Sequence, residues 1–158
     1  ATVVTAFSLP TGSSIKNPAT GFDAPSLFGG VTFNKTYINW LWFVSPGILY
    51  IAPNDNTHLG NGYFYEMGIG KTFYAKSGRH IVAGLFELTG EYTEKNKIAG
   101  QLDPDSGGNT LLLTPSLWYS NNHLTLQFGV SVPLNQQLNG VQNKNKYSIT
   151  AIAAWLFG

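Results

Sequence analysis

The side chains best suited to hydrolytic chemistry are three histidines, His58, His80 and His123. A histidine can act as the general base for a serine nucleophile when a serine and an orienting Asn or Asp converge on it. His58 is expected in a long loop, whereas His80 and His123 are expected beside tight turns at the opposite ends of the strands. No serine has the surroundings of a nucleophile, so we expect no catalytic residue and no enzymatic activity.

Two short segments resemble loops that bind metals or phosphates. Residues Asp103–Asn109 place oxygen ligands at alternate positions, as a calcium loop does, but they lack the later bidentate glutamate of an EF-hand. A solvated turn is the favoured interpretation there and at Ala52–Asn56. Ile69–Thr72 has the Gly-Lys-Thr order of a phosphate loop, but Tyr65 stands where its first glycine should be and no helix is expected to follow. The chain has no Cys, which excludes disulfides, thiol catalysis and zinc–thiolate sites. With the two loop candidates set aside as well, we expect no metal and no cofactor.

Three glutamates are the most informative polar residues, because each lies in a strongly patterned segment on the face opposite its apolar residues. If these segments cross a membrane, Glu66, Glu87 and Glu91 would line a lumen together with Gln127 and Ser131. Such a lining would attract cations or orient a solute. The alternative is an ion-pair network of the glutamates with Lys71 that plugs a narrow barrel, since an eight-stranded barrel has room only for side chains.

The elements that would position these residues are β-strands, because apolar and polar residues alternate with a period of two along most of the chain. The clearest case is residues 124–134, whose alternate positions form one wholly apolar face. Residues 37–51 carry no charge, but Asn39 and Ser45–Gly47 interrupt them and the run is shorter than the roughly 18 apolar residues of a spanning helix. Eight strands are expected, at 3–9, 27–33, 37–51, 63–70, 81–92, 110–119, 124–134 and 147–157.

The charge content limits where such a protein can reside. Only 11% of the residues are charged, whereas a soluble domain typically carries about 25%. The 14% aromatic content argues against disorder, and a mean hydropathy of −0.03 excludes a bundle of membrane helices. With a net charge of +1 and no basic run, we expect no nucleic acid partner.

The connections between the expected strands alternate without exception between long and short. This is the pattern of outer-membrane barrels, whose outer loops are long and whose periplasmic turns are short. Charge supports that interpretation, because within the strands only Glu66, Lys71, Glu87 and Glu91 are charged, whereas a soluble barrel would carry charges along its strands. The expected connections are Thr11–Pro25, Asn34–Thr36, Ala52–Asn61, Tyr74–Arg79, Thr93–Gly108, Ser120–Asn122 and Gln136–Lys146.

Aromatic residues cluster near the ends of the expected strands, as in the girdles that contact lipid headgroups. The alternative is ordinary cross-strand pairing of aromatic residues in a soluble sheet. The girdle candidates are Trp40, Trp42, Tyr63, Tyr65, Trp118, Tyr119, Trp155 and Phe157.

The closing residues Trp155–Phe157 look like the terminal strand by which bacterial outer-membrane proteins are handed to their insertion machinery, although Gly158 follows the aromatic residue. More of the chain resembles the meta-pathway phenol-degradation family of outer-membrane transporters. The matching segments are Leu9–Ser13, Glu87–Glu91, Gly107–Gly108 with Leu113–Ser116, Leu126–Asn135 and the closing aromatic strand. The resemblance implies transport of small aromatic or hydrophobic compounds and supplies no catalytic residue. Members of the family are longer before the Pro-Thr-Gly segment, which implies that this chain is N-terminally incomplete.

We therefore expect one domain over residues 1–158, an all-β, antiparallel transmembrane barrel of the bacterial outer membrane with eight up-and-down strands. Residues 1–10 alternate like a strand and have no basic leader region, which favours a fragment of a longer chain. The expected partners are the lipid bilayer with its lipopolysaccharide, the insertion machinery and a small solute. The expected function is passage of small molecules, and the alternative is a closed barrel that displays its outer loops to partners. About twelve strands in the intact protein would favour the pore, and eight the closed barrel.

Overall fold

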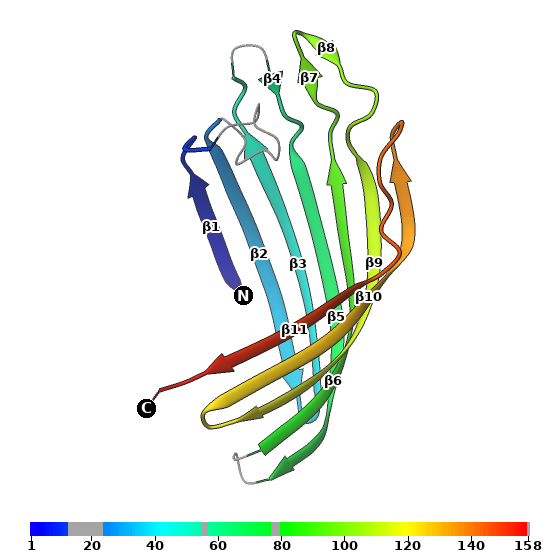
Figure 1. The fold of residues 1–158 in the computed structure, drawn as a ribbon. Helices are drawn as coiled ribbons and strands as arrows, with labels where there is room; N and C mark the ends of the chain where they lie inside the picture. The colour runs from blue at the N-terminus through cyan, green and yellow to red at the C-terminus, as the bar shows by residue number, and fades with distance from the viewer. Residues whose placement is uncertain (13–23, 55–56, 77–79, 158) are drawn as a thin grey trace.

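The computed structural model describes residues 1–12, 24–54, 57–76 and 80–157, and it confirms an antiparallel all-β fold. Eight strands form one sheet in which each strand pairs with the next one along the chain. Figure 1 shows this meander as a continuous series of long arrows. Its strands are β1 (Thr2–Ser8), β2 (Ser26–Tyr37), β3 (Trp40–Ile51), β5 (Gly62–Lys76), β6 (His80–Thr93), β9 (Gly108–Asn121), β10 (Leu124–Leu138) and β11 (Ser148–Trp155).

The predicted alternation of long and short connections is confirmed where the connections are described. Two residues join β2 to β3 and two join β9 to β10, whereas residues 52–61, 94–107 and 139–147 form long connections. In Figure 1 the long connections gather at the upper end and the tight turns at the lower end. Three short strands of the long connections form a second sheet at the upper end: β4 (Thr57–His58), β7 (Lys97–Ile98) and β8 (Gln101–Leu102). Most of the expected connection Thr11–Pro25 lies outside the described residues.

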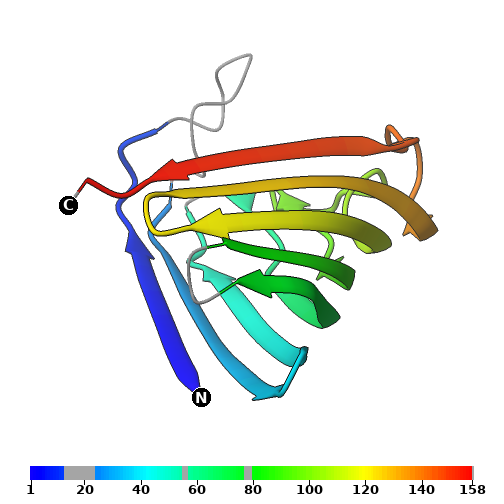
Figure 2. The same ribbon diagram turned by 90° about the horizontal axis from the view of Figure 1, so that it is seen from below.

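The large sheet is strongly curved but not closed (Figures 1 and 2). Strands β1 and β11 are its two edges and are not paired with each other. They are also its shortest strands, with 7 and 8 residues against 12 to 15 in the six between them. The expected closed eight-stranded barrel is therefore not what the structure shows.

One tight turn lies elsewhere than predicted. The expected connection at Asn34–Thr36 is instead part of β2, and the chain reverses at Ile38 and Asn39. Ile38 adopts a φ of 51°, a left-handed conformation that is rare for a β-branched residue and that composition does not signal. As a consequence Lys35, which was expected in a connection, lies in β2 opposite Trp42.

The strand register places every predicted apolar row on the same face of the sheet. Met67 lies opposite both Val44 and Leu88, for example, and Phe128 opposite Leu117 and Ala151. We call this the outer face, because its side chains are more exposed than those of the other face, which is the concave or inner face. The outer face carries Val3, Val31, Val44, Met67, Phe86, Leu113, Phe128 and Ile149 among others.

Little apolar surface is buried within the chain. Among the described residues only Ala24, Ile51 and Leu85 are buried hydrophobic side chains. Large side chains of the outer face stay exposed, with 61% of Phe86 and 53% of Phe128 accessible. No helix in the described part of the chain has the length and apolar character to span a membrane. The apolar rows therefore face outward and do not form a core.

Candidate functional site

The five residues expected to line a lumen all lie on the inner face. Glu66 of β5 is opposite Thr89 of β6, and Glu87 is opposite Gly68 and Thr114. Glu91 lies opposite Phe64 and Thr110 in the same register. Gln127 and Ser131 of β10 lie opposite Ile152 and Ser148 of β11, again on the inner face. Period-two alternation predicted this grouping, because residues of one parity share a face.

Hydroxyl groups hydrogen-bond two of the three carboxylates. The Ser116 hydroxyl donates to the Glu87 carboxylate over 3.2 Å, and the Thr93 hydroxyl donates to Glu91 over 3.4 Å. Thr114 similarly donates to the Ser131 hydroxyl over 2.7 Å. None of the described residues donates a hydrogen bond to the Glu66 carboxylate. Glu66 is thus the acid of the inner face whose carboxylate is left open to a ligand.

Lys71 lies on the opposite face from the glutamates. It pairs with Trp40 and Gly84, and its Nζ atom is 5.1 Å from the centre of the Trp40 ring. The expected alternative, an ion-pair plug of the glutamates with Lys71, is therefore wrong, because Lys71 is five positions after Glu66 and strand residues an odd number of positions apart point to opposite faces. In the described strands of the large sheet, no Lys, Arg or His side chain lies on the inner face.

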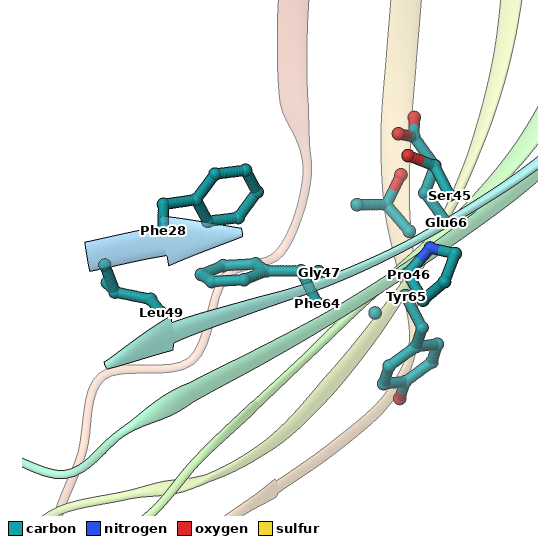
Figure 3. A pocket seen from close by; sticks show the side chains of 10 residues that line it. Phe28, Ser45, Pro46, Gly47, Leu49, Phe64, Tyr65 and Glu66 are labelled. Atoms are coloured by element: carbon teal, nitrogen blue, oxygen red, sulfur yellow. The ribbon is translucent and has the colours of Figure 1, made fainter. Parts of the chain in front are cut away.

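A hollow of about 290 Å³ lies beside Glu66 on the sheet. Phe28 and Phe64 meet edge to face there, with ring centres 6.0 Å apart and an angle of 67°. The Phe28 ring covers Gly47, where an added Cβ would lie 2.9 Å from the ring. Figure 3 shows Ser45 and Glu66 on one side of the strands and Tyr65 on the other. The hollow is lined by Phe28, Ser45, Pro46, Gly47, Leu49, Phe64, Tyr65, Glu66, Thr89 and Gly90.

The sequence did not single out this hollow. Phe28 and Phe64 belong to the rows opposite the apolar rows, so each is an aromatic residue on the face that carries the glutamates. The signal that could have found them is this reversed parity together with the nearby glycines Gly30, Gly47 and Gly62, over which the two rings lie. Thr32 and Ser45, which share a 2.7 Å hydrogen bond between their hydroxyls, extend the polar side of the hollow.

Seven of the eight candidates for an aromatic girdle lie on the outer face or beyond the last strand. Trp40, Trp42, Tyr119 and Trp155 lie toward the short-turn end, and Tyr63 and Tyr65 lie toward the long-loop end. Trp155 stacks on His123, with ring centres 6.2 Å apart. Phe157 follows β11 and is 94% exposed.

Trp118 is the exception among these candidates. It lies opposite Ala83 and Gln127, which places it on the inner face, so it is not part of an outer girdle. The reason is the pleat of the strand, because adjacent residues such as Trp118 and Tyr119 must point to opposite faces. The Trp118 Nε1 atom is buried and has no hydrogen-bond partner.

The other candidate motifs are placed as follows. His58 lies in β4 at the long-loop end, whereas His80 and His123 lie at the short-turn end, where the His80 Nδ1 atom is 2.9 Å from the Tyr119 hydroxyl. Within Asp103–Asn109, a turn precedes β9 and the Asp103 carboxylate accepts the Asp105 N–H over 3.0 Å, whereas Gly108 and Asn109 already belong to β9. No cluster of metal ligands occurs in the part of the chain that the structure describes. Ile69–Thr72 is extended strand within β5.

The long connections are tied together by side chains. The Glu94 carboxylate accepts hydrogen bonds from the Tyr63 hydroxyl over 2.9 Å and from Asn61 Nδ2 over 3.0 Å. Asn96 accepts the Gly60 N–H over 2.9 Å, and its own N–H donates to the Ser106 hydroxyl over 2.9 Å. We call residues 57–61 and 94–107, joined in this way, the loop cap.

No known family profile matches the chain, and no curated protein is significantly similar to it. The resemblance to the phenol-degradation transporters therefore stays a prediction.

Proposed function

We propose that this chain forms a β-barrel pore wall in the bacterial outer membrane and passes small molecules along its inner face. The observation that carries the proposal is the outer face, where large apolar side chains stay exposed and only three described hydrophobic residues are buried. An apolar surface of this extent is typical of a membrane or protein contact. Lipid tails would cover the outer face, and the headgroups would meet the aromatic residues at its two ends.

The lengths of the strands and the placement of the cations support this arrangement. A tilted strand needs about 9–11 residues to cross the hydrocarbon layer, and the six central strands have 12 to 15. The outward-facing Lys35 and Lys71 lie level with the short-turn ends, opposite Trp42 and Trp40. A lysine facing lipid at mid-membrane costs roughly 2–4 kcal/mol, but only about 0–1 kcal/mol near the interface.

The inner face supplies the selectivity of the proposed pore. Glu66, Glu87 and Glu91 are its titratable side chains in the described strands, so its field favours cations and disfavours anions. Gln127 and Ser131 add uncharged hydrogen-bonding groups on the opposite part of the sheet. The resemblance to the phenol-degradation transporters adds small hydrophobic or aromatic compounds as candidate solutes. Closure of the wall requires further strands or pairing of β1 with β11.

Conductance tests the proposal. The full-length protein, refolded into planar bilayers, is expected to give single-channel currents that favour cations over anions. Liposomes that contain it are expected to take up small solutes. A refolded protein that shows neither currents nor uptake would contradict a pore.

The loop cap favours a second candidate function, a closed barrel that displays its outer loops to a partner. Glu94 and Asn96 hold two connections in one arrangement, which would present a defined surface to a partner. Of the two segments expected to be displayed, Thr93–Gly108 belongs largely to the loop cap, and Thr11–Pro25 lies mostly outside the described residues. This function predicts a plugged lumen and binding that depends on the loop cap.

A further inference from the structure

The hollow beside Glu66 combines two chemically different surfaces. One wall is apolar and aromatic, formed by Phe28, Leu49 and Phe64. The other carries oxygen atoms, from the Glu66 carboxylate and from the hydroxyls of Ser45 and Thr89. A molecule that fills the hollow therefore meets an apolar surface at one end and hydrogen-bond acceptors with a negative charge at the other.

The shape of the hollow depends on glycines. Phe28 lies against the sheet because Gly30 and Gly47 leave room for its ring, where an added Cβ would come within 3.1 and 2.9 Å of it. Phe64 lies in the same way over Gly62, with the corresponding distance 3.1 Å. The two rings are thus packed close to the strands at glycine positions, where they form one side of the hollow.

The charge environment of Glu66 determines which ligand fits. Its carboxylate is half-buried and receives no hydrogen bond from the described residues. Glu87, on the neighbouring strand of the same face, adds a second negative charge. No described cation of the large sheet shares this face, so a positive group supplied by a ligand is the complement that the site lacks.

We propose that this hollow binds small organic cations, with an ammonium group on the Glu66 carboxylate and an apolar or aromatic body on Phe28 and Phe64. Ser45 and Thr89 accept further hydrogen bonds from the ammonium group, and the Phe64 ring adds a cation–π contact. The volume of about 290 Å³ is at the small end for ligand pockets, which suits a compound with one ring. A role of this site in the passage of cations through the membrane rests on the pore function proposed above. The binding of a cation in the hollow does not depend on that function.

The position of the hollow agrees with entry from the long-loop end. Phe28 and Leu49 are each two residues from the end of their strand at the long loops, and Phe64 is two residues from the start of β5 there. Ser45, Glu66 and Thr89 lie farther along the strands, toward the short turns. A cation that enters from the long loops would pass the aromatic wall and then reach the carboxylate.

Binding in detergent micelles tests this site without requiring a pore. Isothermal titration near neutral pH would compare three ligands of one shape: benzylammonium, benzyl alcohol and benzoate. We expect benzylammonium to bind about ten- to a hundredfold more tightly than benzyl alcohol, as for a hydrogen bond to a charged group, and benzoate to bind most weakly. The substitution Glu66→Gln keeps the shape and removes the charge, so it should abolish the preference for the cation and leave benzyl alcohol unchanged.

Glu87→Gln is the matched control, because it removes a carboxylate of the same face that Ser116 already hydrogen-bonds. Its charge acts on the ligand only from the neighbouring strand, so its removal should weaken benzylammonium binding by about threefold at most, clearly less than Glu66→Gln does. Equal affinities for benzylammonium and benzyl alcohol in the native protein would overturn the proposal, and so would equal losses in the two variants. Conductance without selective binding would reject this site alone, and selective binding without conductance would reject the pore alone.

Discussion

At the scale of single residues, glycines determine where aromatic side chains can lie on the sheet. On the outer face Tyr65 is opposite Gly90, and its ring occupies the space where a Cβ of Gly90 would be. The Tyr65 hydroxyl then donates a hydrogen bond to Asn109 over 2.8 Å, which links β5 across β6 to β9. A glycine covered by a cross-strand aromatic ring is a known way to stabilise a β-sheet at a position without a side chain.

Replacing this glycine should therefore destabilise the sheet. Gly90→Ala forces the Tyr65 ring off the strand and breaks the hydrogen bond to Asn109, so we expect a loss of about 1–3 kcal/mol in the free energy of unfolding. Gly29→Ala is the matched control, because it lies on the same face with no atom within 4 Å of the added Cβ. It should be neutral or stabilise by about 0.5–1 kcal/mol.

Urea unfolding of the refolded protein in lipid vesicles measures both effects. In a protein that already carries Tyr65→Ala, the change Gly90→Ala should cost little more. The same loss for Gly29→Ala and Gly90→Ala, or an undiminished loss without the tyrosine ring, would show that the ring contact is not the cause.

At the scale of elements, the long connections and the strands form separate structural units. The loop cap is held by bonds among its own residues and to the ends of β3 and β5, such as the Asn61 Oδ1 that accepts the Ile51 N–H over 3.2 Å. The eight-stranded sheet is held by the backbone pairing of adjacent strands. The cap should therefore be removable without unfolding the sheet.

Replacing residues 95–106 by a short Gly-Ser linker tests this and separates the two candidate functions. Since β6 and β9 keep their antiparallel pairing, we expect the protein to keep its folded form on heat-modifiable gel migration. A pore should retain solute uptake in liposomes. The display function would be favoured if trimming abolished partner binding and if neither the native nor the trimmed protein took up solute. Unfolding of the trimmed protein would show that the loop cap is needed for the stability of the sheet.

The sequence predicted the strands well because one physical signal, alternation, covers nearly the whole chain. It predicted the turn at Asn34–Thr36 wrongly, since three polar residues resemble a turn and the φ of Ile38 has no signature in composition. It also listed adjacent Trp118 and Tyr119 together, although a pleated strand separates them. The hollow beside Glu66 depends on which strands are neighbours and in what register, which no single segment contains.

At the scale of the whole molecule, the chain is a sheet with two chemically different faces and almost no interior. Its outer face is apolar from β1 to β11, and its inner face carries the carboxylates, hydroxyls and amides. A soluble protein places the apolar face inward, and this curved sheet places it outward. The assignment of the outer face to lipid is the claim on which the pore, the girdles and the selectivity all depend.

Depth-resolved spin labelling in lipid vesicles tests that assignment most directly, because the chain has no native Cys and each label can be placed alone. Cysteines at Phe86 and Val132 of the outer face would be compared with cysteines at Thr89 and Ser131 of the inner face. We predict that outer labels are accessible to dissolved oxygen and shielded from a water-soluble nickel complex, and that inner labels show the reverse. Outer labels as accessible to the nickel complex as inner ones would contradict the account.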